Sequence, residues 1–330
     1  TGENRVLARY GLVVLRKSRR LGLVKLLRKL KIKQQFLTED DIGFMLAPRI
    51  NAASRMDRPM DAYRLLYTDD EAEAGALSDY LDKINNERKG LVASTIKEIK
   101  KRLNSADEIG KVIVMGNPNW RPGLLGLAAG NLADEYGRPV FLWGREGSSV
   151  IKGSCRSDGS VNVLEMMQTA SDLLLEFGGH AFSGGFSVSD EKVHLLMERF
   201  LSAYGKLKKE KSEGQNLIVD WVGSLEDVIW ETWEHIEKMS PFGESNPKPN
   251  FLFENLEIED RKMFGKNKEH LELSFRKKDG KKISAMKFFA SAENFSRRLE
   301  TGERINLVAS IERSDFKNSP ELRLRIVDIF

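Results

Sequence analysis

Hydrophobic positions follow a helical period through the first third of the chain. A basic segment, 1–36, opens on a short strand-like stretch at 5–7 and continues with helical spacing. Between 69 and 104, apolar side chains recur near every third or fourth position, which predicts one long connecting helix. Because the first residues already stand in a strand-like stretch, we expect the chain to be cut from a longer protein.

From residue 111 the pattern changes to short apolar runs separated by helical segments. A strand at 112–115, a helix at 124–136 and a strand at 140–143 predict a parallel pair with a right-handed crossover. The loop after the first strand lies at its carboxyl end, where α/β sheets bind ligands. The next expected elements are a strand, a helix, a strand and a helix at 150–157, 163–177, 186–188 and 191–204.

The last third of the chain has a β pattern. After a Lys/Glu-rich linker, a strand at 217–221 and a helix at 225–239 lead into five strands and one short helix, at 251–259, 269–276, 282–289, 292–299 (the helix), 304–312 and 321–329. This is the order of an OB-fold barrel. The outward positions of the second barrel strand hold no aromatic residue; they are His270, Glu272, Ser274 and Arg276. Since bases stack on aromatic side chains, we expect backbone electrostatics to dominate any nucleic-acid binding here.

The expected fold class is therefore an α/β domain preceded by a long connecting helix and followed by an all-β OB-fold barrel. The predicted domains are 1–107, 108–205 and 217–330.

The composition of the 330-residue chain bears on its cellular location and on disulfide bonds. No apolar run of about 18 residues is present, and no signal-peptide pattern opens the sequence, so we expect a cytoplasmic protein without a membrane contact. The single Cys155 excludes an internal disulfide.

Charge is concentrated at the start of the chain. Residues 1–36 contain eleven lysines and arginines and one acidic residue, a balance of +10, which leaves −6 for the rest of the net +4. Such a block indicates a nearby polyanion such as nucleic acid, or else a solvated face or a face packed on an acidic domain.

A glycine-rich stretch at 177–185 is the first candidate site. It places His180 among four glycines, and Gly178 and Gly179 directly precede the histidine. Free backbone N–H groups in such a turn suit an anion such as phosphate, and a histidine can donate to phosphate or transfer a proton. The alternative is a helix C-cap, with Gly178 as the first residue beyond the helix, followed by a turn.

Two further stretches offer cations to a phosphate. Small residues surround Arg49, Asn51 and Arg55, so a ligand could approach closely, although an exposed helix end explains the same residues. In the strand at 150–157, alternation puts Lys152, Ser154 and Arg156 on one face. That face suits a phosphate, or alternatively the solvent-facing side of an edge strand.

No metal-binding pattern accompanies these candidates. The four histidines are scattered, and neither a Cys/His cluster nor closely spaced aspartates occur. We therefore expect this chain to bind no metal by itself.

Five motifs, in this order, resemble the RecJ family of single-strand-specific DNA exonucleases in the DHH phosphoesterase superfamily. They are Arg49-Ile50-Asn51-Ala52-Ala53-Ser54-Arg55, the stretch 120–126, Gly153-Ser154-Cys155-Arg156-Ser157, Gly178-Gly179-His180-Ala181 and the stretch 241–247. The third and fourth resemble motifs of the DHHA1 domain. Ser54, Arg121 and Ser245 depart from the family pattern, which usually has glycine, histidine and glycine there.

The resemblance implies that this chain is the DNA-binding C-terminal part of a 5′–3′ exonuclease. A catalytic DHH domain that binds two divalent ions, Mn²⁺ or Mg²⁺, would precede it, and the enzyme would act in DNA repair and recombination. By the same resemblance Arg49, Asn51, Arg55, Ser154, Arg156, Gly178 and Gly179 would contact DNA, with Arg55, Ser154 and Arg156 at its 5′ end. In this family the DNA passes between the DHH and DHHA1 domains, and His180 would line that cleft. Expected partners are single-stranded DNA, the DHH domain and a single-stranded-DNA-binding protein.

Two other functions fit the same residues. One is a non-catalytic nucleic-acid-binding relative of RecJ. The other is a DHHA1 phosphoesterase for short oligonucleotides, although an OB domain would add nothing to such an enzyme.

Overall fold

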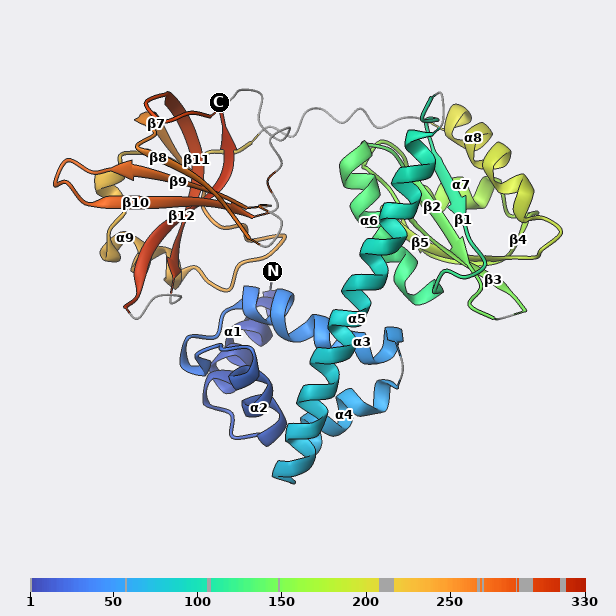
Figure 1. Ribbon diagram of the computed structural model, residues 1–330, viewed down its shortest axis with the longest axis horizontal. Coiled ribbons are helices and arrows are strands. Elements are labelled where there is room, and N and C mark those ends of the chain that lie inside the picture. The colour runs from blue at the N-terminus through green and yellow to red at the C-terminus, as the bar shows by residue number, and fades with distance from the viewer. Residues whose placement is uncertain are drawn as a thin grey trace. The chain divides into compact units, whose positions relative to one another are not determined.

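The computed structural model describes most of the chain, in two compact units. The described residues are 2–56, 58–105, 108–147, 149–207, 217–265, 268, 270–288, 290, 299–314 and 319–330. One unit joins 1–14 to 216–330, and the other comprises 15–215 (Figure 1). Within the described residues, no helix combines the length and apolar character needed to cross a membrane. The division at 1–107, 108–205 and 217–330 stays a prediction.

The first third of the chain is helical. Its elements are α1 (Gly2–Lys17), α2 (Leu21–Lys29), η1 (Gln34–Phe36), η2 (Asp41–Leu46), α3 (Ala47–Met56), α4 (Pro59–Tyr67) and α5 (Glu71–Asn104). The strand expected at 5–7 is wrong, since these residues lie inside α1. Three residues without a partner strand would leave their backbone groups unpaired, whereas a helix pairs them internally.

The basic block is partly neutralised by the long helix. Lys25 of α2 binds Glu71, and Lys29 binds Asp79, each with 2.6 Å between nitrogen and oxygen. These pairs support the interpretation of the block as a face packed on acidic side chains, at least over α2.

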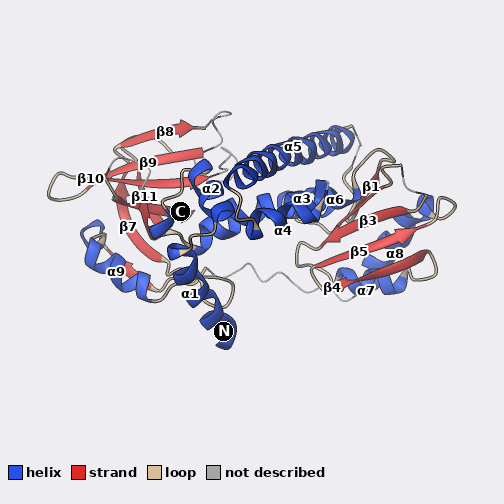
Figure 2. Cartoon of the chain, turned by 90° about the horizontal axis from the view of Figure 1, so that it is seen from below, coloured by secondary structure: helices blue, strands red, loops and turns tan. Residues whose placement is uncertain are grey.

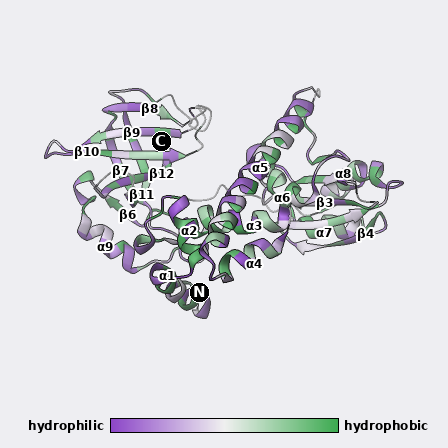
Figure 3. Cartoon of the chain, turned by 60° about the horizontal axis from the view of Figure 1, so that its bottom comes forward, coloured by the Kyte–Doolittle hydropathy of each residue, from purple (hydrophilic) through white to green (hydrophobic). Residues whose placement is uncertain are grey.

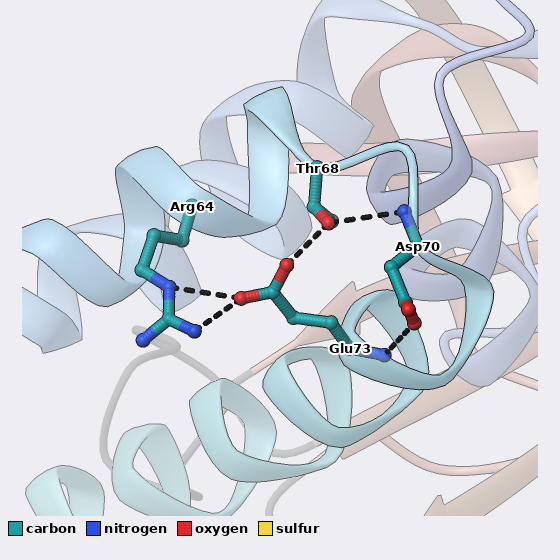
Figure 4. Close-up of polar contacts among 4 residues, drawn as sticks. All are labelled: Arg64, Thr68, Asp70 and Glu73. Carbon is teal, nitrogen blue, oxygen red and sulfur yellow. Dashed lines mark hydrogen bonds and ion pairs between the residues drawn. The ribbon is translucent and has the colours of Figure 1, made fainter.

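The long connecting helix is confirmed as α5, and its start is fixed by polar contacts (Figure 4). The Asp70 side chain accepts a hydrogen bond from the Glu73 backbone N–H at 2.8 Å, which caps the first turn. The Glu73 carboxylate in turn binds Thr68 and Arg64 of the preceding segment. The hydropathy colours alternate along α5 (Figure 3), because one side of the helix packs inward.

A five-stranded sheet follows, in the order β1-β2-β3-β5-β4. The strands are β1 (Ile113–Gly116), β2 (Val140–Gly144), β3 (Ile151–Arg156), β4 (Leu174–His180) and β5 (Ser183–Val188). The predicted parallel pair is confirmed as β1 and β2, joined through α6 (Pro122–Tyr136), and the remaining pairs are antiparallel.

Helices cover the two faces of this sheet unequally (Figure 2). On one face, α5 and α6 bury side chains of β1 and β2. On the other face, α7 (Val163–Thr169) and α8 (Leu196–Lys206) pack on residues from all five strands. From β4, only Leu174 at its start belongs to this core. Helix α6 also lies over β3, so the first face is left open mainly over β5 and β4.

Two expectations about this region are wrong. The helix expected at 163–177 ends at Thr169, and Leu174–His180 forms β4 instead. Gly178 is thus a strand residue and not the residue after a helix, because β4 finds a hydrogen-bonding partner in β5. The edge-strand interpretation of 150–157 also fails, since β3 lies between β2 and β5.

The C-terminal unit is an OB fold, as predicted. It contains β6 (Trp221–Gly223), η4 (Leu225–Asp227), α9 (Trp230–Lys238), β7 (Phe251–Glu257), β8 (Asp260–Phe264), β9 (His270–Arg276), β10 (Lys282–Phe288), β11 (Arg304–Ser314) and β12 (Glu321–Ile329). The strand expected at 251–259 is confirmed as β7, which pairs with β11. The strand β8, which follows it and pairs with β9, was not expected, and these successive strands lie toward opposite ends of the sheet. The helix expected at 292–299 falls on residues that, except for Leu299, lie outside the described part.

Candidate functional site

Three neighbouring strands carry the candidate side chains on one face of the α/β sheet. The pairing of β3 with β5 and of β5 with β4 aligns one row, consisting of Arg156, Ser183 and His180. The adjacent row on the same face consists of Ser154, Gly185 and Gly178. Opposed residues share a face, as do residues two positions apart, so the two rows form one surface. We call it the β3–β5–β4 face.

Two glycines leave the middle of this face without side chains. A Cβ atom built on Gly178 would meet no atom within 4 Å, and one on Gly185 would meet only the Gly153 carbonyl oxygen, at 3.6 Å. Nothing in the fold therefore requires glycine at these two positions for lack of space. Their effect is to let a ligand reach the strand backbone between Ser154 and Gly178.

Gly179, by contrast, is required by the fold. Its φ angle is +150°, and a Cβ there would lie 2.2 Å from the Ser183 carbonyl oxygen. Successive residues of a strand face opposite sides of the sheet, so Gly179 belongs to the face opposite Gly178. The structure thus supplies a packing reason for Gly179, and its DNA contact stays a prediction.

The Arg156 guanidinium lies in the space left by a glycine of α6. A Cβ atom on Gly126 would stand 2.9 Å from Nη2 of Arg156, so a larger residue would displace the guanidinium. Nη1 donates to the carbonyl oxygen of Cys155 at 2.7 Å. Burial, and further the nearby Arg55 cation, lower the pKa of Arg156, although the group stays charged at neutral pH.

Helix α3 brings a second cation to the same place. Nη1 of Arg55 donates to the Gly123 carbonyl oxygen of α6 at 2.9 Å, while the side chain remains exposed. Asn51 is also exposed and lies one helical turn before Arg55. Both residues are available to a ligand.

Arg49 occupies a different position, although it belongs to the same motif. Only 7% of its surface is exposed. Its Nε binds Asp82 of α5 at 2.9 Å, and its Nη1 donates to the Met45 carbonyl oxygen at 2.7 Å. The guanidinium therefore stabilises the packing of α3 on α5, and its DNA contact stays a prediction without geometric support.

Arg55 and Arg156 have no acidic partner, although several other arginines of this unit do. Among the described residues, neither forms a salt bridge, whereas Arg49, Arg64, Arg102, Arg121, Arg145 and Arg199 all do. Two adjacent cations of which one is half-buried repel each other, and an anion between them would relieve that repulsion.

His180 ends β4, just before the hairpin turn. The backbone N–H of Phe182 donates to its Nδ1 at 3.3 Å, and the Phe182 ring lies edge-on at 6.4 Å between centroids. In the described part of the chain, no carboxylate or hydroxyl is hydrogen-bonded to this imidazole, so no such group orients it as a base. The ring thus lines the open face, and a catalytic role stays a prediction.

The buried Cys155 beside Arg156 is a packing residue. Its side chain points to the opposite face and contacts the Met167 sulfur at 3.9 Å. Burial raises the pKa of this thiol to about 12, so it remains protonated and unreactive at neutral pH.

Comparisons with known proteins agree with this architecture. A DHHA1 domain model matches residues 109–206, and a RecJ OB domain model matches residues 219–328. The single-stranded-DNA-specific exonuclease RecJ of Bacillus subtilis (strain 168) is 31% identical over 327 residues, which is 99% of this chain and 41% of that protein. The chain is RecJ-like.

Solved structures extend the match to the fold. The crystal structure of RecJ from Thermus thermophilus in complex with Mg²⁺ superposes with a TM-score of 0.79 at 26% identity, over 99% of this chain and 49% of that one. The curated RecJ of Thermus thermophilus is 33% identical over 264 residues, 79% of this chain and 37% of the relative. The chain thus spans less than half of each of these RecJ proteins.

Solved RecJ structures contain metal ions: the Thermus thermophilus protein was crystallised in complex with Mg²⁺ and in complex with Mn²⁺. Within the part of this RecJ-like chain that the structure describes, no group of three or more His, Cys, Asp or Glu side chains could hold a metal ion. These residues do not fit a divalent-metal centre, so we assign them no metal-dependent step.

The RecJ OB domain presents aromatic rings that sequence reasoning missed. Phe264 of β8 and Phe288 of β10 flank His270 of β9, with ring centroids 5.0 and 5.1 Å from the histidine. The Arg325 guanidinium lies 4.2 Å from the centroid of Phe288. The outward positions of β9 do lack aromatics, but neighbouring strands supply them. Aromatic rings therefore stand beside the charged groups on these strands, and the expectation that backbone electrostatics dominate binding stays a prediction.

Sequence reasoning also missed Ser183 and Gly185, which complete the β3–β5–β4 face. Both belong to the glycine-rich stretch that was singled out, but the expected helix C-cap assigned them to a turn. The signal that could have found them is the alternation of small residues at 183 and 185, which continues the alternation of β5.

Proposed function

We propose that this chain is the strand-binding part of a RecJ-type 5′–3′ exonuclease and that it holds the 5′ end of single-stranded DNA. The observation that carries the proposal is the open β3–β5–β4 face. It combines Ser154, Arg156 and His180 around two glycines, with Arg55 beside them and no described acid paired to either arginine.

The chemistry of this face suits a terminal phosphate. The Arg156 guanidinium and the Ser154 hydroxyl lie two residues apart on one strand and can donate to the same phosphate. Arg55 adds a second cation from α3, and the side-chain-free strip at Gly178 and Gly185 admits the nucleotide. His180 bounds the strip at its hairpin end. Each residue binds or orients the strand, while bond cleavage belongs to the whole enzyme.

The wider role follows from the names of the relatives, single-stranded-DNA-specific exonucleases. The whole protein would hydrolyse phosphodiesters with Mg²⁺ or Mn²⁺ bound by a DHH domain, in the cytoplasm, during DNA repair and recombination. Single-stranded DNA is the partner that the chemistry of this chain supports. A single-stranded-DNA-binding protein is a further partner suggested only by the family resemblance.

Binding measurements on the chain test the proposal. Arg156→Gln should weaken binding of 5′-phosphorylated single strands by about tenfold or more, because a charge-assisted hydrogen bond contributes roughly 1.5–3 kcal/mol. Binding of the same strand with a 5′-hydroxyl should change much less. Arg199→Gln is the matched control, since Arg199 pairs with Asp172 and lies on α8, against the opposite face.

Two results would contradict the proposal. If Arg156→Gln weakened both strands equally, Arg156 would contact the backbone in general and not the 5′ end. If only dinucleotides bound the wild-type chain, and longer strands did not, the short-oligonucleotide phosphoesterase would be the better assignment.

A further inference from the structure

Two more cations stand on α5 where the helix leaves one core and enters the next. The buried residues of α5 stop at Asn85 and resume at Ile99. The first group packs with α2, α3 and α4, and the second packs with α6 and the sheet. Arg88 and Lys89 lie at the start of the interval between them.

These two residues continue the series of cations that begins at Arg156. Burial first, and then the charges of Arg55 and Arg49, lower the pKa of Arg88. Desolvation by neighbouring side chains, and then the charges of Arg49 and Arg88, likewise lower the pKa of Lys89, while Asp82 acts in the opposite direction. The charge of Arg55 in turn contributes to lowering the pKa of Arg156. Each of these cations therefore lies near the next, from Arg156 of β3 through Arg55 at the end of α3 to Arg88 and Lys89 of α5.

No described acid neutralises the α5 end of this series. Neither Arg88 nor Lys89 takes part in a salt bridge within the described residues, and the nearby Asp82 is already bound to Arg49 at 2.9 Å. Nε of Arg88 is buried without a hydrogen-bond partner. By contrast, basic residues of α2 that pack on the same helix find Glu71 and Asp79. Leaving a partly buried cation unpaired is costly, which indicates that an anion belongs here.

We propose that Arg88 and Lys89 bind a second, internal phosphate of the strand whose 5′ end lies at Arg156. The inference rests on the proposed function and deepens it, because it makes the preferred ligand an oligonucleotide and not a terminal nucleotide alone. Arg55, which we place at the terminal phosphate, lies between Arg156 and this second site. None of the sequence motifs includes Arg88 or Lys89.

The test compares the double variant Arg88→Gln/Lys89→Gln with Lys97→Gln/Lys101→Gln. The control pair removes the same charge from exposed positions farther along the same helix. The probes are a 5′-phosphorylated oligodeoxynucleotide, its 5′-hydroxyl form and a 5′-phosphorylated dinucleotide, each titrated at several salt concentrations.

We expect the Arg88/Lys89 variant to bind the oligonucleotide about tenfold or more weakly, as the removal of a charge-assisted hydrogen bond implies. The slope of log K against log salt should become shallower by about 0.7 for each phosphate that the variant no longer binds. The preference for the 5′-phosphate and the binding of the dinucleotide should stay as in the wild type, because Arg156 is intact. The control pair should change both quantities less.

The two proposals fail separately. If the Arg88/Lys89 variant bound the oligonucleotide with unchanged affinity and salt slope, the second site would be refuted, whatever Arg156→Gln does. If the variant lost the 5′-phosphate preference as well, a separate internal site would also be refuted. Melting curves establish that each variant is folded. Should the double variant be unfolded, the exposed single change Lys89→Gln decides the same question through its salt slope.

Discussion

At the residue scale, two consecutive glycines perform different tasks. Gly178 faces open space on the β3–β5–β4 face, whereas a Cβ at Gly179 would collide with the Ser183 carbonyl oxygen at 2.2 Å. Gly178→Val should therefore fold, because β-branched residues suit strands, yet it should weaken DNA binding by filling the strip. Gly179→Ala should lower stability by about 1–3 kcal/mol or more, since alanine is strained at a φ of +150°.

Melting temperature and single-strand affinity, measured on both variants, separate the two roles. Equal loss of stability in both would mean that the hairpin as a whole requires glycine. Full DNA binding by a folded Gly178→Val variant would mean that the strand does not cross the strip.

Sequence reasoning found the correct residues of β3 because a strand has a fixed period. Ser154 and Arg156 share a face in the structure as period-2 alternation requires. The same reasoning could not distinguish Arg49 from Arg55, which stand six positions apart in one motif. Which of the two is neutralised depends on Asp82, a residue of another helix, and no local pattern records that contact.

At the element scale, the errors concern segments whose conformation depends on a distant partner. The first residues of β4, 174–177, were expected to extend the preceding helix, but antiparallel pairing with β5 stabilises them as part of a strand. The strand β8, which was not expected, likewise depends on pairing with β9. The long helix α5 was predicted correctly because its apolar spacing and its Asp70 cap are local.

The contact of α5 with the loop after β1 predicts a pH effect on stability. The Glu98 carboxylate accepts hydrogen bonds from Trp120 Nε1 at 2.9 Å and from Asn117 Nδ2 at 3.0 Å, and it also pairs with Arg102. The hydrogen bond from Trp120, and further those from Asn117 and the Arg102 charge, hold the pKa of Glu98 below its usual 4.5.

A lowered carboxyl pKa in the folded state stabilises the protein above the unfolded pKa, and this contribution is lost as the pH falls through the folded value. Glu98→Gln should therefore flatten the loss of stability on the acid side of pH 4.5 while leaving the pH dependence near neutrality unchanged. The solvent exposure of Glu98 limits the size of the effect. Urea unfolding at a series of pH values measures it, and identical acid profiles for variant and wild type would show that the carboxylate charge is not linked to folding.

At the scale of the whole molecule, each of the two units has a surface whose side chains have the chemistry to contact a single strand. The α/β unit has the β3–β5–β4 face with its flanking cations, and the OB unit has the rings of Phe264, His270 and Phe288 with Arg325. The sequence predicted the type and order of these parts. It could not show the aromatic surface, because three strands each contribute one ring.

The chain by itself should bind single-stranded DNA without cleaving it. Among the described residues no carboxylate or histidine group could hold a divalent ion, while unpaired cations line the α/β unit. Binding should weaken with salt at a slope of about −0.7 per phosphate contact. The slope should be shallower than the eleven basic residues of 1–36 would give if all bound phosphate, because Lys25 and Lys29 are already paired with acids. Affinity titrations over a range of salt, together with incubation of labelled single strands with Mn²⁺, test both parts. Metal-dependent degradation that persists after repurification would place catalytic residues in this chain, and binding indifferent to salt would exclude the cationic surface as the binding site.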